Sequence, residues 1–368
     1  MSLKAGIVGM PNVGKSTLFN AITNSQVEAA NYPFATINPN SGVVEVPDSR
    51  LDYLCSLWNP LRRVAATFEF TDIAGLVKGA SKGEGLGNQF LANIRETDAI
   101  CHVVRCFKNQ DILHVSGKVD AIDDVETINL ELIFADLETV NNRIAKVEKK
   151  AKTTKEPETV FEYELLVKVR DTLLNEKPAR SLSLTNEERK VLKLFNLLTF
   201  KPVIYVANMG EDDIKDYNGN EQYLRLKEFA KNEGSAIVPI CAKVEADLLE
   251  LTDPDEKALF MEELGLHESG LHNLIKTAYD LLGLRTFLTC GHDECRAWTF
   301  KNGMKAPQCA GIIHTDFEKG FIKAEVYSFA DLLTYKSEQG VKDAGKYRIE
   351  GKEYLMQDGD IVFFKFNK

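Results

Sequence analysis

Short apolar or alternating runs, five to seven residues long, recur along the chain between polar or glycine-containing turns. Runs of this length are typical of buried strands, because a helix needs a longer periodic stretch. They predict strands at residues 4–9, 41–46, 65–71, 99–104, 202–207 and 236–240. A helical pattern over residues 15–24 follows the first run. Strands that alternate with helices predict an α/β fold with a mostly parallel sheet.

Residues 118–198 interrupt this alternation with a longer helical period. Apolar residues spaced alternately three and four positions apart form a heptad seam: Leu130, Ile133, Leu137, Val140, Ile144 and Val147. Such a seam is typical of a long helix that packs against a neighbour. Pro157 interrupts the pattern, and a second helical run follows around Leu165 and Leu173. We expect an antiparallel helical hairpin inserted into the α/β part of the chain.

The tip of this expected hairpin is rich in basic residues, namely Arg143, Lys146, Lys149, Lys150, Lys152 and Lys155. A charged run of this kind is usually a solvated helix face, and contact with RNA is the alternative.

From residue 281 onward the pattern changes again. Strand-like pieces occupy residues 297–300, 311–315, 320–327 and 361–366, with one helical stretch around 328–338. Such a mixture predicts a compact α+β domain. The pattern therefore divides the chain into an α/β domain at residues 1–117 and 199–280, a hairpin at 118–198 and a final domain at 281–368.

Composition narrows the classes of function. Apolar residues make up 44% and charged residues 27% of the chain, as in an ordinary globular protein. No apolar run approaches the roughly 18 residues of a membrane span, so we expect no membrane partner. The net charge of −10 disfavours a DNA-binding protein, although a local basic surface could still meet RNA. The seven cysteines are scattered along the chain, which is typical of reduced thiols in a cytoplasmic protein. We also expect the protein to be a monomer.

A glycine-rich segment between the first predicted strand and the first helix carries the clearest chemistry. Residues 9–16, GMPNVGKS, fit the pattern G-x-x-x-x-G-K-[ST] in the strand–loop–helix context that it requires. Gly9 and Gly14 let backbone N–H groups turn toward a phosphate, and the helix start adds its dipole. Lys15 reaches the β- and γ-phosphates, and Ser16 offers its hydroxyl to Mg²⁺. We therefore expect a P-loop that binds a nucleoside triphosphate.

Two further segments fit the same chemistry. Asp72 follows the strand at residues 65–71, where a carboxylate can hold Mg²⁺ through water. Gly75 comes three residues later, where its N–H can reach the γ-phosphate. Thr36 lies in the loop between the two motifs, and its hydroxyl can close over Mg²⁺ as a switch. A surface turn is the alternative for Thr36.

The combination of motifs resembles a known family. GMPNVGKST at residues 9–17, NYPFAT at 31–36 and DIAGLVKGASKGEGLGNQF at 72–90 are similar to the Obg-related GTPases, which belong to the TRAFAC class of P-loop NTPases. Those proteins carry N-K-x-D after the fifth strand, and its Asp binds guanine. This chain has NMGE at residues 208–211, which resembles the Obg-like ATPases of the YchF type. Residues 314–326, HTDFEKGFIKAEV, resemble their TGS domain, a ubiquitin-like β-grasp fold.

The resemblance implies a role for each motif position. The phosphates of ATP would be held by Asn12, Val13, Gly14, Lys15, Ser16 and Thr17. Mg²⁺ would be bound by Ser16, Thr36 and, through water, Asp72. The base would meet Asn208, Met209 and Glu211, with Cys241, Ala242 and Lys243 beside it. Adenine inverts the donors and acceptors of guanine, which fits the loss of the N-K-x-D carboxylate. Asn12 is similar to the P-loop Asn of potassium-activated relatives, so K⁺ stimulation is a further hypothesis.

Hydrolysis also needs a group that positions the attacking water. Ras-type proteins place Gln directly after D-x-x-G, but here this position is Leu76, whose apolar side chain cannot orient water. His114, which follows the strand at residues 99–104, is the candidate, because a neutral imidazole can accept a hydrogen bond from water. A surface or helix-capping role is the alternative for His114. Lys15 and Gly75, both aimed at the γ-phosphate, complete the predicted catalytic set.

The resemblance implies Mg²⁺-dependent ATP hydrolysis used as a conformational switch. It also implies that the ribosome or a ribosomal subunit is the partner, with a role in translation or stress control. Two other functions stay open. One is a GTPase with relaxed base choice, since Glu211 still carries a carboxylate. The other is a nucleotide-gated module that binds RNA or protein and whose hydrolysis is incidental.

Overall fold

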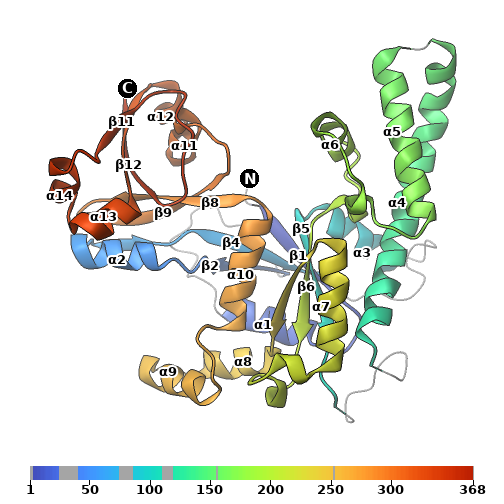
Figure 1. Cartoon of the computed structure of the whole chain (residues 1–368), viewed down its shortest axis with the longest axis horizontal. Coiled ribbons are helices and arrows are strands. Elements are labelled where there is room, and N and C mark those ends of the chain that lie inside the picture. The colour runs from blue at the N-terminus through green and yellow to red at the C-terminus, as the bar shows by residue number, and fades with distance from the viewer. Residues whose placement is uncertain are drawn as a thin grey trace. The chain divides into compact units, whose positions relative to one another are not determined.

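The computed structural model describes residues 3–24, 40–73, 86–109, 119–154, 156–251 and 253–367 (Figure 1). By packing, the chain forms two compact units. The described residues of unit 1 lie within Met1–Ser25, Ile37–Gly42 and Glu69–Leu274, and those of unit 2 lie within Val43–Phe68 and Ile275–Lys368.

Unit 1 is built around a six-stranded sheet in the order β2-β4-β1-β5-β6-β7. Its strands are β1 (Lys4–Val8), β2 (Ser41–Glu45), β4 (Thr67–Asp72), β5 (Ala99–Arg105), β6 (Val203–Asn208) and β7 (Ala236–Ile240). The pairs β4–β1, β1–β5, β5–β6 and β6–β7 are parallel. Strands β5 and β6 are buried at every position, which explains their unbroken apolar runs. All six predicted strands are confirmed to within two residues.

The parallel sheet brings the predicted motifs to one edge. The carboxyl ends of neighbouring parallel strands lie at the same edge, where ligands bind in open α/β sheets. The P-loop follows β1, Asp72 ends β4, and the segment at 208–211 begins at the end of β6. Helix α1 (Lys15–Asn24), which starts inside the P-loop motif, contacts β1 and confirms the predicted helix.

The remaining helices of unit 1 are α3 (Leu86–Arg95), α4 (Ala121–Thr153), α5 (Pro157–Leu174), α6 (Asn186–Lys193), α7 (Glu221–Glu233), α8 (Ala242–Glu250), α9 (Pro254–Glu263) and α10 (Gly270–Leu281), the last of which ends in unit 2. Short 3₁₀ turns lie at Ala179–Ser181, Leu198–Phe200, Glu211–Asp213 and Tyr217–Gly219. Among the helices of the described residues, none has both the length and the hydropathy that crossing a bilayer requires.

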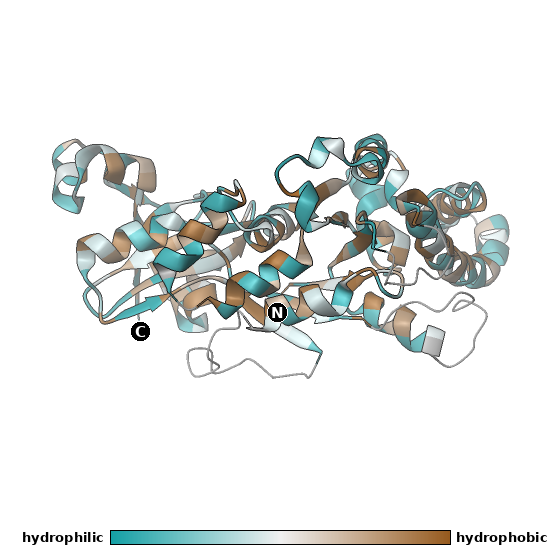
Figure 2. Cartoon of the chain, turned by 90° about the horizontal axis from the view of Figure 1, so that it is seen from below, coloured by the Kyte–Doolittle hydropathy of each residue, from teal (hydrophilic) through white to brown (hydrophobic). Residues whose placement is uncertain are grey.

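Helices α4 and α5 form the predicted hairpin, which we call the arm (Figure 1). Asp120 caps the start of α4 by accepting hydrogen bonds from the backbone N–H groups of Ile122 and Asp123, and Pro157 occupies the first turn of α5. Four residues of the predicted heptad seam, Ile133, Val140, Ile144 and Val147, are buried in one cluster with apolar residues of α5 such as Leu166. Leu137 is partly buried against this cluster, and Leu130 does not belong to it. Both helices carry apolar and polar faces in Figure 2. By packing, the arm belongs to unit 1.

The basic tip of the arm is partly neutralised by acidic neighbours. Three of its cations form ion pairs, which are Arg143–Glu162, Lys150–Glu156 and Lys152–Glu148. Lys155 lies outside the described residues. Exposed pairs of this kind add only about 0–1 kcal/mol each to stability, but they offset positive charge that an RNA phosphate would otherwise meet. The pairing therefore favours the solvated face over the RNA contact.

Unit 2 contains a second six-stranded sheet in the order β11-β10-β12-β8-β9-β3. Its strands are β3 (Arg62–Val64), β8 (Leu284–Cys290), β9 (Glu294–Lys301), β10 (Phe321–Ser328), β11 (Arg348–Glu350) and β12 (Asp360–Phe366). Its helices are α2 (Ser49–Trp58), α11 (Ala306–Ile313), α12 (Thr315–Lys319), α13 (Phe329–Tyr335) and α14 (Glu338–Asp343). The hairpin β8–β9 is antiparallel, β12 pairs with β8 in parallel, and buried residues of α11 share one core cluster with residues of β8, β9, β10 and β12. This arrangement matches the expected β-grasp fold.

One predicted strand of this unit is wrong. Residues 311–313 are the last residues of α11, His314 has an extended backbone, and Thr315 is the first residue of α12. The apolar Ile312 and Ile313 suggested a strand, but the buried positions Ala306, Cys309 and Ala310 follow the spacing of a helix face. His314 then caps α12 by accepting a hydrogen bond from the N–H of Asp316. The helical stretch expected around 328–338 is confirmed as α13.

The segment Val43–Phe68 differs from expectation, because it packs in unit 2 and not with the α/β residues around it in the sequence. Strand β3 pairs in parallel with β9, and α2 contacts β8 and β9. The unit boundary therefore falls inside β2 and β4.

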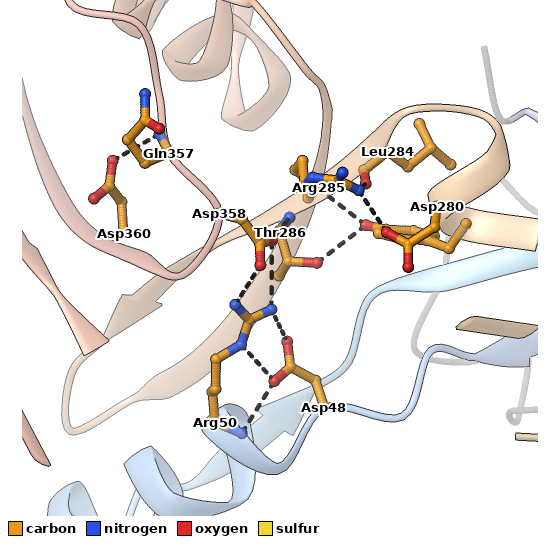
Figure 3. Close-up of polar contacts among 10 residues, drawn as sticks. Asp48, Arg50, Asp280, Leu284, Arg285, Thr286, Gln357, Asp358 and Asp360 are labelled. Carbon is orange, nitrogen blue, oxygen red and sulfur yellow. Dashed lines mark hydrogen bonds and ion pairs between the residues drawn. The ribbon is translucent and has the colours of Figure 1, made fainter. Parts of the chain in front are cut away.

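Arg50 fixes this segment to the turn before β12 (Figure 3). Its guanidinium donates hydrogen bonds to Asp48 at 2.8 Å and to Asp358 at 2.7 Å. Asp358 also accepts from the backbone N–H of Thr286 on β8 at 2.8 Å. Burial alone would lower the pKa of Arg50, but the hydrogen bonds to both carboxylates raise it above its ordinary value. The guanidinium thus joins three segments that are distant in the sequence.

Candidate functional site

The loop between β1 and α1 has a backbone that only small residues allow. Gly14 has a φ of 95°, and Asn12 has a φ of 62°. A Cβ atom on Gly14 would lie 2.2 Å from Nδ2 of Asn208, and one on Gly9 would lie 2.5 Å from the carbonyl oxygen of Val103. Side chains at these two glycines would therefore collide with β5 and β6. This is the compact turn that a P-loop needs to bring backbone N–H groups to one point.

Asn208 at the end of β6 is the joint that holds this loop in place. Its Nδ2 donates to the carbonyl oxygen of Val13 at 2.8 Å, and its Oδ1 accepts from the N–H of Ala242 at 3.1 Å. The side chain is 4% exposed. One amide group thus ties the P-loop to the start of α8, so that phosphate-binding and base-binding segments keep a fixed spacing.

Lys15 and Asp72 form the charged pair of the site. Lys15 is 9% exposed, and its Nζ donates to the carbonyl oxygen of Met10 at 2.7 Å. Burial lowers the pKa of Lys15, and the charge of Asp72 works against that shift. Burial raises the pKa of Asp72, while Lys15 opposes the change. Lys15 and Asp72 therefore each stabilise the charged form of the other, which burial alone would destabilise.

Ser16 and Asp72 carry oxygen atoms suited to a magnesium ion, and they line two different cavities, that of Asp72 being about 240 Å³ in volume. Oδ1 of Asp72 is buried and has no hydrogen-bond partner among the described residues. Ser16 is exposed and lines the same cavity as Lys15. A hydroxyl and a carboxylate oxygen are ligands that Mg²⁺ prefers, and a bound cation would satisfy the unpartnered oxygen of Asp72.

A cavity of about 710 Å³ lies above the carboxyl ends of β1, β5 and β6. Eleven of the twelve predicted nucleotide-binding residues line it: Asn12, Gly14, Lys15, Ser16, Thr17, Asn208, Met209, Glu211, Cys241, Ala242 and Lys243. The twelfth, Val13, is fully buried and contributes its carbonyl group to the contact with Asn208. The volume suits a mononucleotide, since ligand pockets range from about 300 to 1,000 Å³.

Glu211 and Lys243 face each other across this cavity. Nζ of Lys243 donates to Oε2 of Glu211 at 2.7 Å, and both side chains are about half exposed. An ion pair this exposed to water contributes only about 0–1 kcal/mol to stability. Met209 is 2% exposed and brings a thioether where related GTPases carry a lysine.

One wall of the cavity, formed by residues that follow β5, was not predicted from the sequence. Phe107, Lys108 and Asn109 follow β5 and line the cavity together with Asp212. A Cβ atom on Gly210 would lie 3.6 Å from Cβ of Phe107, so the two walls meet there. The signal was available, because β5 lies between β1 and β6 and its carboxyl end must face the same ligand.

Three predicted residues cannot be placed. Thr36, Gly75 and His114 lie outside the described residues. Their expected roles as switch, γ-phosphate donor and water-positioning group stay predictions.

Comparison with family models gives two matches. The YchF-GTPase_C model, described as a protein of unknown function (DUF933), matches residues 284–367. A model described as a 50S ribosome-binding GTPase matches residues 4–133.

Similar proteins cover the whole chain. A Bacillus subtilis protein named ribosome-binding ATPase YchF is 59% identical over 367 residues, which is 100% of both chains. An Escherichia coli O157:H7 protein of the same name is 55% identical over 368 residues, again 100% of both chains. The solved structure of the Schizosaccharomyces pombe YchF GTPase is 42% identical, has a TM-score of 0.89, and covers 99% of this chain and 98% of its own. The fold, the P-loop site and these full-length matches together show that the chain belongs to the YchF family of P-loop NTPases.

Proposed function

We propose that the chain binds ATP with Mg²⁺ in the cavity of unit 1 and hydrolyses it to ADP and phosphate. The supporting observation is that the cavity joins a complete P-loop to the segment 208–211, which lacks the lysine and aspartate of guanine-binding relatives. Similar proteins are named ATPases in some cases and GTPases in others. The residues on the base side of the cavity distinguish adenine from guanine.

The base-side residues favour adenine. Guanine recognition uses a carboxylate that accepts hydrogen bonds from two N–H groups of the base. Here the carboxylate sits on the longer Glu211 and is held by Lys243 at 2.7 Å. Met209 is apolar where guanine-binding relatives carry a lysine, and the ring of Phe107, which also lines the cavity, can stack on a base. An adenine needs no free carboxylate at this position, whereas a guanine would have to displace Lys243.

The phosphate-side residues perform the other half of the reaction. The N–H groups of the P-loop and the start of α1 bind the phosphates, and Nζ of Lys15 exchanges its contact with Met10 for the β- and γ-phosphate oxygens. Mg²⁺, when bound by Ser16 and Asp72, neutralises phosphate charge. We propose that Thr36 and Gly75 close on the γ-phosphate and open after hydrolysis, which makes the reaction a switch.

Calorimetric titration with the non-hydrolysable imido analogues of ATP and GTP tests the base assignment. We expect the ATP analogue to bind at least tenfold more tightly in the presence of Mg²⁺, which corresponds to about 1.4 kcal/mol. The double variant Met209→Lys with Glu211→Asp restores the guanine-binding residues and is expected to reverse the preference. Equal affinity, or tighter binding of the GTP analogue by the natural chain, would reject the ATPase and favour the relaxed GTPase.

We also propose that the ribosome or a ribosomal subunit is the partner, and that the protein acts in the cytoplasm in translation or stress control. Support comes from relatives named ribosome-binding ATPases that match the chain from end to end. Turnover of ATP is expected to rise when ribosomes are added. Tight ribosome binding with no turnover in either condition would favour a nucleotide-gated binding module.

His114 is proposed to orient the attacking water. Replacing His114 with Ala should leave the Kd for ATP unchanged and lower kcat, because imidazole acts only on the water. An unchanged kcat would end this proposal. K⁺ stimulation through Asn12 is checked in the same assay, and equal turnover in Na⁺ and K⁺ buffers would contradict it.

A further inference from the structure

A buried guanidinium contacts the cavity wall formed by Phe107 and Asn109. Arg105 is the last residue of β5 and is 1% exposed, although an arginine side chain is rarely buried to this extent. Its Nε donates to the carbonyl oxygen of Phe107 at 3.3 Å, and one of its terminal nitrogens donates to the carbonyl oxygen of Asn109 at 2.9 Å. Both acceptors belong to residues that line the cavity.

The same guanidinium also lies against the ring of Phe107. Cζ of Arg105 is 4.5 Å from the ring centroid, within the range of a cation–π contact. The guanidinium of Arg105 therefore contacts both the backbone carbonyl and the ring of Phe107. A flat, forked guanidinium can hold two carbonyls and a ring at once, whereas a lysine ammonium cannot.

A carboxylate on the arm helix balances the buried charge. Asp124, in the first turn of α4, is 2% exposed and its charge acts on Arg105. Burial lowers the pKa of Arg105, and Asp124 opposes that shift. On the other side, the carbonyl of Cys106 accepts from Nδ2 of Asn220 at 2.9 Å. The turn at 106–109 is thus held at several points, with Arg105 at its centre.

We propose that Arg105 is a positioning residue for nucleotide binding, which sets the place of Phe107 and Asn109 against the base and sugar of the nucleotide. Arg105 itself does not touch the ligand. This inference rests on the proposed function, because it requires that a nucleoside triphosphate occupies the cavity.

Two ligands separate positioning from a merely structural role. ATP occupies both halves of the cavity, whereas inorganic tripolyphosphate occupies only the P-loop half. In calorimetric titrations of the full chain, Arg105→Met is expected to raise the Kd for the ATP analogue about tenfold and leave the Kd for tripolyphosphate unchanged. Arg105→Lys keeps the charge but loses the fork, so a smaller rise is expected. In turnover assays, KM should rise more than kcat falls.

Arg180→Lys serves as the matched control. Arg180 is another arginine of unit 1 with a largely buried side chain, and it forms an ion pair with Glu233 at 2.8 Å. Neither residue lines the nucleotide cavity. This variant is expected to lower the melting temperature without changing the ratio of the two Kd values. The inference is overturned if the Arg105 variants bind the ATP analogue like the natural chain, if both ligands weaken by the same factor, or if neither variant folds. Failure of the natural chain to bind the ATP analogue would instead reject the proposed function.

Discussion

Replacement of Lys15 by Met is expected to reduce kcat for ATP hydrolysis by about 10²–10³-fold, the loss seen when one charge-stabilising donor is removed from an active site. The reason is that Lys15 lines the cavity within the P-loop, where its Nζ donates to the carbonyl oxygen of Met10 at 2.7 Å. It is also nearly buried, so its charge acts through a poorly solvated medium and is little screened. The measurement is single-turnover ATP hydrolysis with saturating Mg²⁺.

Lys231→Met is the control for this experiment. Lys231 lies exposed in the last turn of α7, and its replacement should leave kcat within twofold of the natural chain. Thermal melting of both variants shows whether the fold is kept. A Lys15→Met variant that is folded and retains more than a tenth of the natural kcat would remove Lys15 from the catalytic set.

Truncation of Leu166 to Ala is expected to lower the free energy of unfolding by about 3 kcal/mol, within the range of 2–5 kcal/mol for such changes in protein cores. Leu166 lies in α5, is fully buried, and belongs to the cluster that holds α5 against α4. Chemical denaturation followed by circular dichroism measures the effect.

Leu174→Ala is the matched control in the same helix. Leu174 is 62% exposed, so its truncation should change the free energy of unfolding by less than about 0.5 kcal/mol. Equal effects of the two substitutions would mean that the arm does not pack through the α4 seam. If Leu166→Ala lowered stability only in a separate unfolding transition at lower denaturant concentration, the arm would unfold independently of the sheet.

The sequence patterns could predict the sheet of unit 1 because each of its strands is a short apolar run with no competing period. They could also predict most of the site, since the P-loop and the residues around Asn208 are local motifs. Lys15 and Asn208 are 193 positions apart, yet both are placed by strands whose parallel order follows from the α/β pattern.

Other features depend on contacts that no local pattern encodes. Strand β3 has only three residues and joins its sheet by pairing with β9, more than 200 positions away. Arg50 and Asp358 meet across a similar separation in the sequence. No pattern around Arg105 predicts that its guanidinium is buried against the ring of Phe107, which follows from the fold. The helix at 311–313 was missed because β-branched side chains outweighed the wider spacing of its buried face.

The length of helix α4 determines how far its outer end moves when its base rotates. It runs without interruption for 33 residues from Ala121 to Thr153, so it is about 50 Å long. Its first turn holds Asp124 beside Arg105 at the nucleotide cavity, while its last turn lies at the far end of the arm. For a rigid rod of this length, a rotation of about 5° at the base displaces the other end by about 4 Å. A small change of angle at the base of α4 would therefore be a large displacement at the tip of the arm.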